Sequence, residues 1–252
     1  MKLYAGIDIG SRTIELVVVD KHKKIMDFRQ ADTGFDPITQ AHQILEGVDY
    51  DQIMATGYGR GLFETAFDEA GTVTEIKAHA KGVTAFFPGA MAILDIGGQD
   101  SKAIALNDKG RVKKFEMNDR CAAGTGKFLE IMARNLGFSI DDFGAAALGA
   151  QNDLSINSMC TVFAESEVTS LIARGADRRE IARGVHLSVV KRAVGMINRV
   201  SSQGPIVFSG GVANNLCIRE LVSRKLSRQV LVPEIPQMMG ALGAALILAD
   251  QA

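Results

Sequence analysis

The chain alternates short apolar runs, rich in β-branched residues, with longer segments whose apolar residues recur at helical spacing. It opens with two such runs, 3–9 and 14–20, separated by the polar turn Gly10-Ser11-Arg12-Thr13. This pattern predicts a strand, a tight turn and a second strand. Further strands are expected at 23–29 and 52–56, and helices at 37–47 and within 74–86.

The opening pattern returns at residue 92. A strand at 92–96 ends in an acid and glycines, a second strand follows at 103–106, and the turn 107–110 leads into a strand at 112–117. The same motif thus occurs twice, 87 positions apart: a strand, an acid, a glycine turn and a second strand. Its two copies contain Asp8-Ile9-Gly10-Ser11 and Asp95-Ile96-Gly97-Gly98. This repeat is the clearest indication of how the chain is organised.

The remainder alternates predicted helices with short strands, which makes the chain an α/β protein. A helical face runs from Phe128 to Leu136, and Asp177-Arg178-Arg179-Glu180 predicts a capping box at the start of a long helix. A buried strand at 206–208 precedes a glycine pair. A helix through Leu226, a strand at 230–232 and a helix at 240–248 complete the pattern.

Composition excludes several function classes. The 252 residues carry a net charge of −1 with both signs interspersed, so nothing predicts a nucleic-acid partner or a polybasic membrane surface. No apolar run reaches about 18 residues, so no membrane-spanning helix is expected. Asp8 comes too early for a signal peptide, and a cytoplasmic protein is the default expectation.

The two glycine turns are candidate phosphate sites. Glycine lets backbone N–H groups approach phosphate oxygens, which makes Gly10, Ser11, Arg12 and Thr13 candidates, together with Gly97 and Gly98. Asp8 and Asp95 end the preceding strands and could hold Mg²⁺, largely through water. Any one such turn is also typical of an ordinary loop.

A third glycine pair follows the strand at 206–208. Gly210 and Gly211 stand at a strand-to-helix turn with Asn214 close behind. A bare backbone there could admit a flat nucleoside. Three glycine turns in this order are more specific than any one of them.

Three cysteines have no regular spacing, which argues against a disulfide framework. Cys121 and Cys160 each directly precede a predicted helix, where free N–H groups and the positive end of the helix dipole favour a thiolate. A reactive, redox or metal-binding thiol is one interpretation; a small buried residue is the other. The four histidines show no zinc-ligand spacing.

The order of these motifs resembles the actin, hsp70 and sugar-kinase ATPase superfamily. Five stretches narrow the resemblance to the activators of 2-hydroxyacyl-CoA dehydratases and the related ATPase subunits of benzoyl-CoA reductases. It covers nearly the whole chain, and the two cysteine motifs are the most specific. The stretches are residues 57–60, 95–102, 118–126, 160–167 and 210–213.

The resemblance implies an α/β fold of two related, ribonuclease H-like ATPase domains that flank a nucleotide cleft. The first would cover residues 1–88, completed by the C-terminal helix 238–252. The second would cover 89–237 and carry the cysteines. Such proteins bind ATP or ADP with Mg²⁺, and their Mg²⁺ ligands here would be Asp8 and Asp95.

The resemblance also implies an ATP-hydrolysing electron donor. It would be a homodimer with one 4Fe–4S cluster between the subunits, a ferredoxin or flavodoxin as electron source, and a cluster-containing dehydratase or reductase as acceptor. Cubane clusters normally need four thiolates. Cys121 and Cys160, doubled by a two-fold axis, supply four. The expected setting is the cytoplasm of an anaerobe.

Several residues receive specific roles by this resemblance. Gln99 and Asp100 are candidates to orient or activate water, with Asp95 as a base or partner of the Mg²⁺-bound water. Lys102 is a candidate cation for phosphate, its alternative being an exposed strand lysine. Gln237 is placed near the nucleotide by resemblance alone. Cys217 is interpreted as a packed residue, not a ligand.

One position departs from the family pattern. Relatives often carry lysine where this chain has Glu15, and a carboxylate there cannot pair with phosphate. Arg12 could supply the charge, or Glu15 could contact Mg²⁺ or face away. The alternatives to the electron donor are a small-molecule kinase on the same fold and a regulatory nucleotide-binding protein. A kinase would need an acceptor pocket but no paired cysteines.

Overall fold

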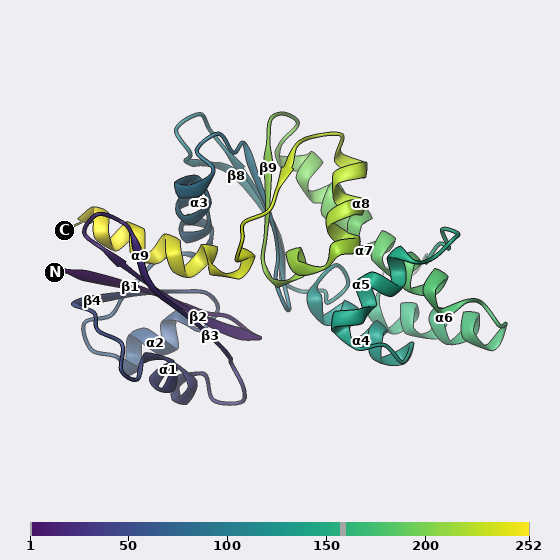
Figure 1. The fold of residues 1–252 in the computed structure, drawn as a ribbon, viewed down its shortest axis with the longest axis horizontal. Helices are drawn as coiled ribbons and strands as arrows, with labels where there is room; N and C mark the ends of the chain where they lie inside the picture. The colour runs from purple at the N-terminus through teal and green to yellow at the C-terminus, as the bar shows by residue number, and fades with distance from the viewer. Residues whose placement is uncertain (1, 157–159, 252) are drawn as a thin grey trace. The chain divides into compact units, whose positions relative to one another are not determined.

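The computed structural model describes residues 2–156 and 160–251. Within them, two five-stranded mixed sheets are each covered by helices (Figure 1), which confirms the predicted α/β class. The chain divides into two compact units, and each is described by itself. Unit 1 comprises the chain up to Met91, residues 106–113 and the chain from Pro233 on, whereas unit 2 comprises 92–105 and 114–232. The predicted functional boundaries at 88/89 and 237/238 stay a prediction; Met1 and Ala252, which end the predicted ranges, lie outside the described residues.

The sheet of unit 1 has the order β3-β2-β1-β4-β5. β1 pairs with β2 in antiparallel fashion and with β4 in parallel fashion, so β1 is central and buried on both faces. The five strands are β1 (Leu3–Ile9), β2 (Thr13–Asp20), β3 (Ile25–Asp32), β4 (Gln52–Thr56) and β5 (Gly71–Thr72).

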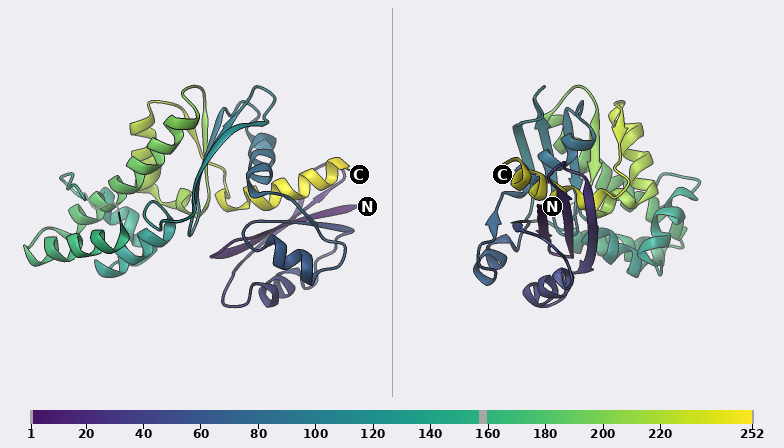
Figure 2. Two further views of the ribbon diagram at one scale, coloured as in Figure 1. Left: turned by 180° about the vertical axis from the view of Figure 1, so that it is seen from behind. Right: turned by 60° about the vertical axis from the view of Figure 1, so that its left-hand side comes forward.

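Helices cover both faces of this sheet (Figures 1 and 2). α1 (Pro37–Leu45) and α2 (Arg60–Ala66) bury Ile44 and Phe63 in one apolar core with alternate residues of β1 and β2. α9 (Met239–Gln251) lies on β1, β2 and β4, and α3 (Glu75–Phe86) packs against α9. A Cβ at Gly6 would overlap the α9 backbone, so strand and helix are in direct backbone contact.

The sheet of unit 2 has the order β10-β9-β6-β7-β8 and repeats the central arrangement of the first. β6 pairs with β7 antiparallel and with β9 parallel. The strands are β6 (Ala92–Ile96), β7 (Ser101–Leu106), β8 (Val112–Asn118), β9 (Ile206–Ser209) and β10 (Val230–Leu231).

Five α-helices of unit 2 form a single large core with one face of that sheet. The long helix α7 contributes many of its buried residues, among them Val185, Val189 and Ile197. The helices are α4 (Gly126–Asn135), α5 (Ile140–Leu148), α6 (Thr161–Ala173), α7 (Arg178–Val200) and α8 (Leu216–Leu226), with short 3-10 turns η1 (Gly211–Asn214) in unit 2 and η2 (Pro236–Met238) in unit 1.

The predicted start of α7 is confirmed in one of its two parts. Asp177 Oδ1 accepts the N–H groups of Arg179 and Glu180 at 2.7 and 3.3 Å, as a helix cap does. Glu180 Oε1, the expected reciprocal arm of a capping box, accepts instead from the amide of Asn152 at 2.6 Å. Glu180 therefore ties α7 to the segment that follows α5.

Several strand boundaries differ from the prediction by one to three residues, and the differences are largest for the third strand and for the strand predicted from residue 103. The third strand starts at Ile25, not residue 23, because the Asp20 carboxylate accepts the N–H groups of His22 and Lys24 and closes a turn in which Lys23 has φ 67°. The strand predicted from residue 103 begins at Ser101, which pairs with Ile96. Helices α2 and α5 had not been predicted.

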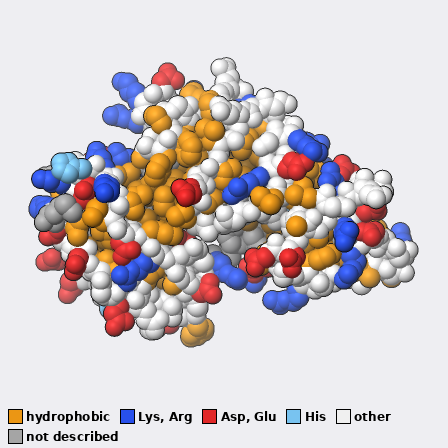
Figure 3. Space-filling view, viewed as in Figure 1, with side chains coloured by type: hydrophobic (Ala, Val, Ile, Leu, Met, Phe, Trp, Pro, Cys, Tyr) orange, Lys and Arg blue, Asp and Glu red, His pale blue; other side chains and the backbone are white. Residues whose placement is uncertain are grey.

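No helix among the described residues is long and apolar enough to span a membrane. On the viewed face of the molecule, Lys and Arg side chains lie interspersed with Asp and Glu (Figure 3). On this face the basic and acidic side chains therefore do not gather into a patch of one charge.

Candidate phosphate-binding hairpins and cysteine loops

The first hairpin joins β1 to β2 through a tight glycine turn. The Gly10 N–H donates to Thr13 O at 3.1 Å, which leaves Ser11 and Arg12 exposed at the tip. Asp8, near the end of β1, is 6% exposed and stands directly opposite Glu15 in the pairing register. Opposite residues of an antiparallel pair share a face, so both carboxyl groups lie on the same side of the sheet.

The second hairpin repeats this turn. The Gly97 N–H donates to Asp100 O at 3.0 Å, and Asp95 is paired in register with Lys102. Lys102 Nζ lies 3.2 Å from Asp95 Oδ2 and 2.8 Å from Asp100 Oδ2, and its side chain is 1% exposed. The alternative of an exposed strand lysine is therefore wrong. Gln99 is exposed at the tip of this turn.

Each aspartate lies close to a glycine that follows the neighbouring parallel strand. Gly57 follows β4 with φ 84°, and a Cβ there would overlap Asp8 Oδ1 and Ile9 O. Gly210 follows β9 with φ 82°, and a Cβ there would overlap Ile96 O and approach Asp95 Oδ1. Only glycine fits either place, because the backbone is left-handed and the carboxylate adjoins it.

Glu15 is held inside unit 1. Its side chain is buried at 5% exposure, and its Oε1 accepts from the Gln30 amide at 3.2 Å. Because it shares the face of Asp8, the first hairpin carries two carboxyl groups where the second carries a carboxylate and an ammonium group.

Sequence reasoning missed two side chains beside Asp8. Glu75 and His79 lie at the start of α3, and each offers a ligand atom within 4.8 Å of the others and of Asp8. His79 Nδ1 lies 3.1 Å from Glu75 O. Their spacing of four residues on one helix face was a visible signal. These three residues could hold a divalent cation.

Two polar side-chain atoms of unit 1 are buried without a hydrogen-bond partner among the described residues. One is the hydroxyl oxygen of Thr56, which pairs in register with Asp8, and the other is Gln237 Oε1. Buried polar atoms normally have a partner, so an orphan indicates a place where a ligand or water completes the structure. Gln237 was singled out from the sequence; Thr56 was not.

The first cysteine loop is tightly built. The Asn118 side-chain amide donates to Cys121 O at 2.9 Å and to Ala123 O at 3.3 Å. Thr125, fully buried, donates both its N–H and its hydroxyl to Ala122 O, at 3.0 and 2.6 Å. Cys121 is half-buried in this loop, five residues before α4 begins, so the prediction that it directly precedes a helix is wrong.

The second cysteine directly caps a helix. Cys160 is exposed and is the N-cap residue of α6. Val162 and Phe163 follow it on the first turn and are 66% and 68% exposed, an unusual amount of apolar surface for a helix start. Cys217 is different: it is fully buried in α8, and burial raises the pKa of its thiol to about 12. It fits the packed role predicted for it.

Hydrogen bonds of Asn215 and His186 hold the end of the candidate nucleoside loop in place. After Gly210, the turn η1 leaves Gly211 and Asn214 exposed, and Asn215 Oδ1 accepts the Ile218 N–H at 3.0 Å to cap α8. The Asn215 amide lies 3.0 Å from His186 Nε2, whose ring Nδ1 lies 2.7 Å from Ala182 O. Burial lowers the pKa of His186 to about 4.

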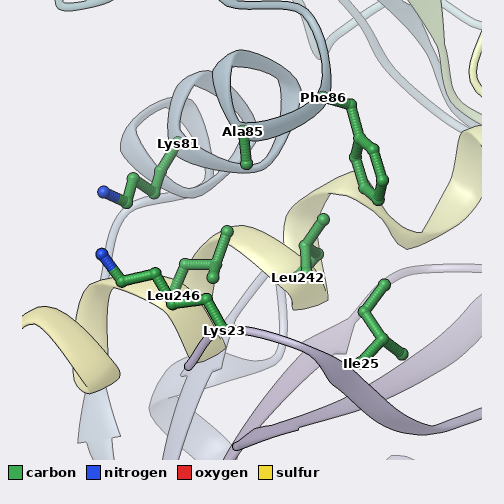
Figure 4. A pocket seen from close by; sticks show the side chains of 7 residues that line it. All are labelled: Lys23, Ile25, Lys81, Ala85, Phe86, Leu242 and Leu246. Atoms are coloured by element: carbon green, nitrogen blue, oxygen red, sulfur yellow. The ribbon is translucent and has the colours of Figure 1, made fainter. Parts of the chain in front are cut away.

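A pocket of about 320 Å³ lies elsewhere in unit 1 (Figure 4). Lys23 and Lys81 extend to the same side of it, and each forms an ion pair with Asp250. Burial alone would raise the pKa of Asp250, but hydrogen bonds from the two lysines outweigh it and lower the pKa. None of the predicted site residues lines this pocket.

Comparison with known proteins identifies the family. The activator of lactoyl-CoA dehydratase from Anaerotignum propionicum is 43% identical over 96% of this chain and 95% of its own length. The structure of the 2-hydroxyisocaproyl-CoA dehydratase activator from Clostridium difficile, with bound ADPNP, superposes with a TM-score of 0.91 at 37% identity, covering 99% of this chain and 95% of its own. Component A of (R)-2-hydroxyglutaryl-CoA dehydratase from Acidaminococcus fermentans gives 0.92 at 34% identity, covering 100% and 99%.

A more distant structure shows the fold alone. A ROK family glucokinase from Streptomyces griseus superposes with a TM-score of 0.57 at 16% identity and covers 99% of this chain and 100% of its own. The two sheets thus have the actin-like ATPase fold that the motif order predicted. A model of the BadF/BadG/BcrA/BcrD ATPase family matches residues 5–248, and the chain belongs to that family.

Proposed function

We propose that the protein is an ATP-hydrolysing, homodimeric electron donor that carries one 4Fe–4S cluster and serves a cluster-containing dehydratase or reductase. The observation that carries the proposal is the contrast among the three cysteines. Cys121 and Cys160 are accessible and precede helix N-termini, whereas Cys217 is fully buried. The relatives named above are activators of 2-hydroxyacyl-CoA dehydratases, which supports the same class of partner.

The donor set fits a cubane cluster. Two accessible thiols per chain give the required four when a second copy contributes the same pair. The exposed Val162 and Phe163 beside Cys160 offer apolar surface for that second copy to cover. Such a cluster, held by these thiolates, would take up and release single electrons. The partial positive charge at the α6 N-terminus would stabilise the thiolate of Cys160, its N-cap residue.

ATP binding is assigned to the glycine turns. The turns at Gly10 and Gly97, with Ser11, Arg12, Thr13 and Gly98, present backbone N–H groups suited to phosphate oxygens. Gly210, Gly211 and Asn214 would accept the nucleoside, and Gln237 would lie near it. Asp8 and Asp95 would bind Mg²⁺ largely through water, with Glu75 beside Asp8 as a further candidate.

Hydrolysis needs a group that orients water. The exposed Gln99 and the half-buried Asp100 stand at the tip of the second turn and are assigned this role. Lys102 would act through Asp95 and Asp100, both of which it contacts inside the sheet. A ferredoxin or flavodoxin would supply the electron.

Iron analysis after anaerobic reconstitution tests the proposal. The expected result is four iron and four sulfide per dimer, as one cubane requires. Cys121→Ser and Cys160→Ser should each abolish that iron. Cys217→Ser is the matched control and should retain it, since its thiol is buried in α8. An iron-free wild-type dimer, or full iron in either of the first two variants, contradicts the assignment.

A steady-state ATPase assay tests the assignment of Gln99. Gln99→Ala should lower kcat by about 100-fold with little change in KM, the usual effect of removing a group that handles the proton or water of the reacting step. Gln203→Ala, a second exposed glutamine of unit 2, is the control. An unchanged kcat in Gln99→Ala would remove this residue from the mechanism.

A further inference from the structure

The start of α4 is capped in an unusual way. The first N–H groups of a helix lack partners within the helix and are commonly satisfied by the side chain of the N-cap residue. Thr125 is the N-cap residue of α4 but makes no such bond, because its hydroxyl donates to Ala122 O. The N–H groups of Gly126 and Lys127 donate instead to Gly97 O and Gly98 O, at 2.9 and 2.7 Å.

The second glycine turn is therefore the cap of α4. The contact is close, because a Cβ at Gly126 would lie 3.1 Å from Gly97 O and 3.4 Å from Gly98 Cα. It would also lie 3.3 Å from a methyl group of Val212, which belongs to the candidate nucleoside loop. One helix start thus rests against both nucleotide-binding candidates of unit 2.

The other side of this helix start is the Cys121 loop. Thr125 donates twice to Ala122 O, and the Asn118 amide bridges Cys121 O and Ala123 O. Residues 121–125 are thereby fixed to the first turn of α4. A shift of the Gly97–Gly98 backbone must move this turn, because the two hydrogen bonds and the close packing leave no slack between them.

We infer that Gly126 and Lys127 are positioning residues that transmit the nucleotide state of the Gly97–Gly98 turn to Cys121. Phosphate bound by the N–H groups of this turn would reorient its peptide units, and the carbonyl groups of those units hold α4. The inference rests on the proposed function, since it requires nucleotide at the turn. Among the described residues, no backbone hydrogen bond links the first turn of α6 to a glycine turn, so we expect a weaker nucleotide response at Cys160.

The test uses the full-length, cluster-free protein under reducing, anaerobic conditions. The alkylation rates of Cys121 and Cys160 by iodoacetamide are measured separately by peptide mass spectrometry, with and without Mg²⁺-ADP. ADP should change the rate at Cys121 by at least about fivefold, which is the lower range of allosteric coupling. The rate at Cys160 should change less.

Two variants of one residue isolate the backbone bond. Lys127→Pro removes the N–H that donates to Gly98 O, and proline is tolerated in the first turn of a helix. It should abolish the ADP response at Cys121. Lys127→Ala is the matched control; it keeps the N–H, loses only the exposed side chain that contacts Glu130, and should respond like the wild type.

The outcomes separate the inference from the proposed function. A wild-type response in Lys127→Pro, or ADP binding with no change at Cys121, overturns the coupling and leaves the ATPase proposal intact. Failure of the wild type to bind ADP overturns both. If Lys127→Pro does not fold by circular dichroism, Gly126→Pro decides, because it removes the N–H that donates to Gly97 O at the first helical position, where proline is favoured. A full response in that variant counts against the inference.

Discussion

The two glycine hairpins have the same backbone but different charges. In each, the glycine N–H closes the turn on the carbonyl of the third residue along, and an aspartate ends the first strand. In each, a left-handed glycine from the parallel neighbour adjoins that aspartate. The residue opposite the aspartate differs: it is Glu15 in the first hairpin and Lys102 in the second.

The comparison shows which features the two hairpins share. Backbone N–H groups and one aspartate carboxylate are common to both hairpins. These are the groups proposed to bind phosphate and Mg²⁺. The charge of the residue opposite the aspartate differs between the two sheets and depends on the local contacts of that residue. Lys102 is buried between two carboxylates, whereas Glu15 accepts a hydrogen bond from Gln30. A side-chain departure at Glu15 therefore leaves the backbone device unaltered.

The largest expected effect is at Lys102. Lys102→Met removes the ammonium group that bridges Asp95 and Asp100, and breaking a buried ion pair on one side costs about 3 to 5 kcal/mol. Urea denaturation followed by circular dichroism measures the loss. Glu15→Gln, the corresponding change in the first hairpin, should cost under about 1.5 kcal/mol, because an amide can still hydrogen-bond to Gln30. Equal losses would erase the distinction between the hairpins.

Acid should destabilise unit 2 through His186. Burial lowers the pKa of this imidazole from 6.5 to about 4 in the folded state, so the unfolded state binds the proton more readily. The stability it confers is complete above pH 6.5 and is lost as the pH falls toward 4, a loss of about 3 kcal/mol.

Denaturation curves at several pH values measure this loss. His186→Gln should be less stable at pH 7, since the buried bond to Asn215 is disturbed, but should have a shallower decline between pH 6.5 and 4. An identical decline in variant and wild type would assign the acid sensitivity to other groups.

The glycines beside the aspartates should behave alike in both units. Gly57→Ala and Gly210→Ala should each cost at least about 2 kcal/mol, because alanine resists the left-handed backbone and its Cβ overlaps a carbonyl oxygen. Gly61→Ala is a control on open space in α2. Thermal unfolding of the three variants measures these losses. A Gly210→Ala variant as stable as the wild type would show that the second hairpin can adjust to a Cβ at this position.

The smallest effect concerns two matched hydroxyl groups. Ser209 and Thr56 stand opposite Asp95 and Asp8 on the parallel neighbours. Ser209 donates to Asp95 at 2.9 Å, so Ser209→Ala should cost about 1.5 kcal/mol. Thr56→Val removes a buried hydroxyl that has no partner in the described part of the chain, and it should be neutral within about 0.5 kcal/mol. A large loss in Thr56→Val would contradict its orphan status.

Sequence reasoning succeeded where the signal is local. The repeated acid-and-glycine turns and the cap at Asp177 are each written within four residues, and the structure reproduces them. It failed where long-range contacts decide the outcome. Lys102 was a candidate cation for phosphate, with an exposed strand lysine as the alternative, yet it lies buried between two carboxylates. Glu75 and His79 approach Asp8 only after α3 has packed on α9.

Boundaries failed for a related reason. The strand that follows Asp20 starts late because one carboxylate closes the turn before it, a choice that apolar periodicity cannot reveal. The loop support by His186 and Asn215 joins residues 29 positions apart, and no local pattern marks it. The roles of individual site residues remain predictions, because they depend on ligands.

The packing of α9 on β1, β2 and β4 has a consequence for synthesis of the chain. β1 precedes unit 2 in the chain and α9 follows it, so during translation one face of the first sheet stays uncovered while the whole of unit 2 is being made. Unit 2 can complete its large core earlier. The first sheet therefore emerges from the ribosome before unit 2 but reaches its native state after it, and during that interval it is open to aggregation and to chaperones.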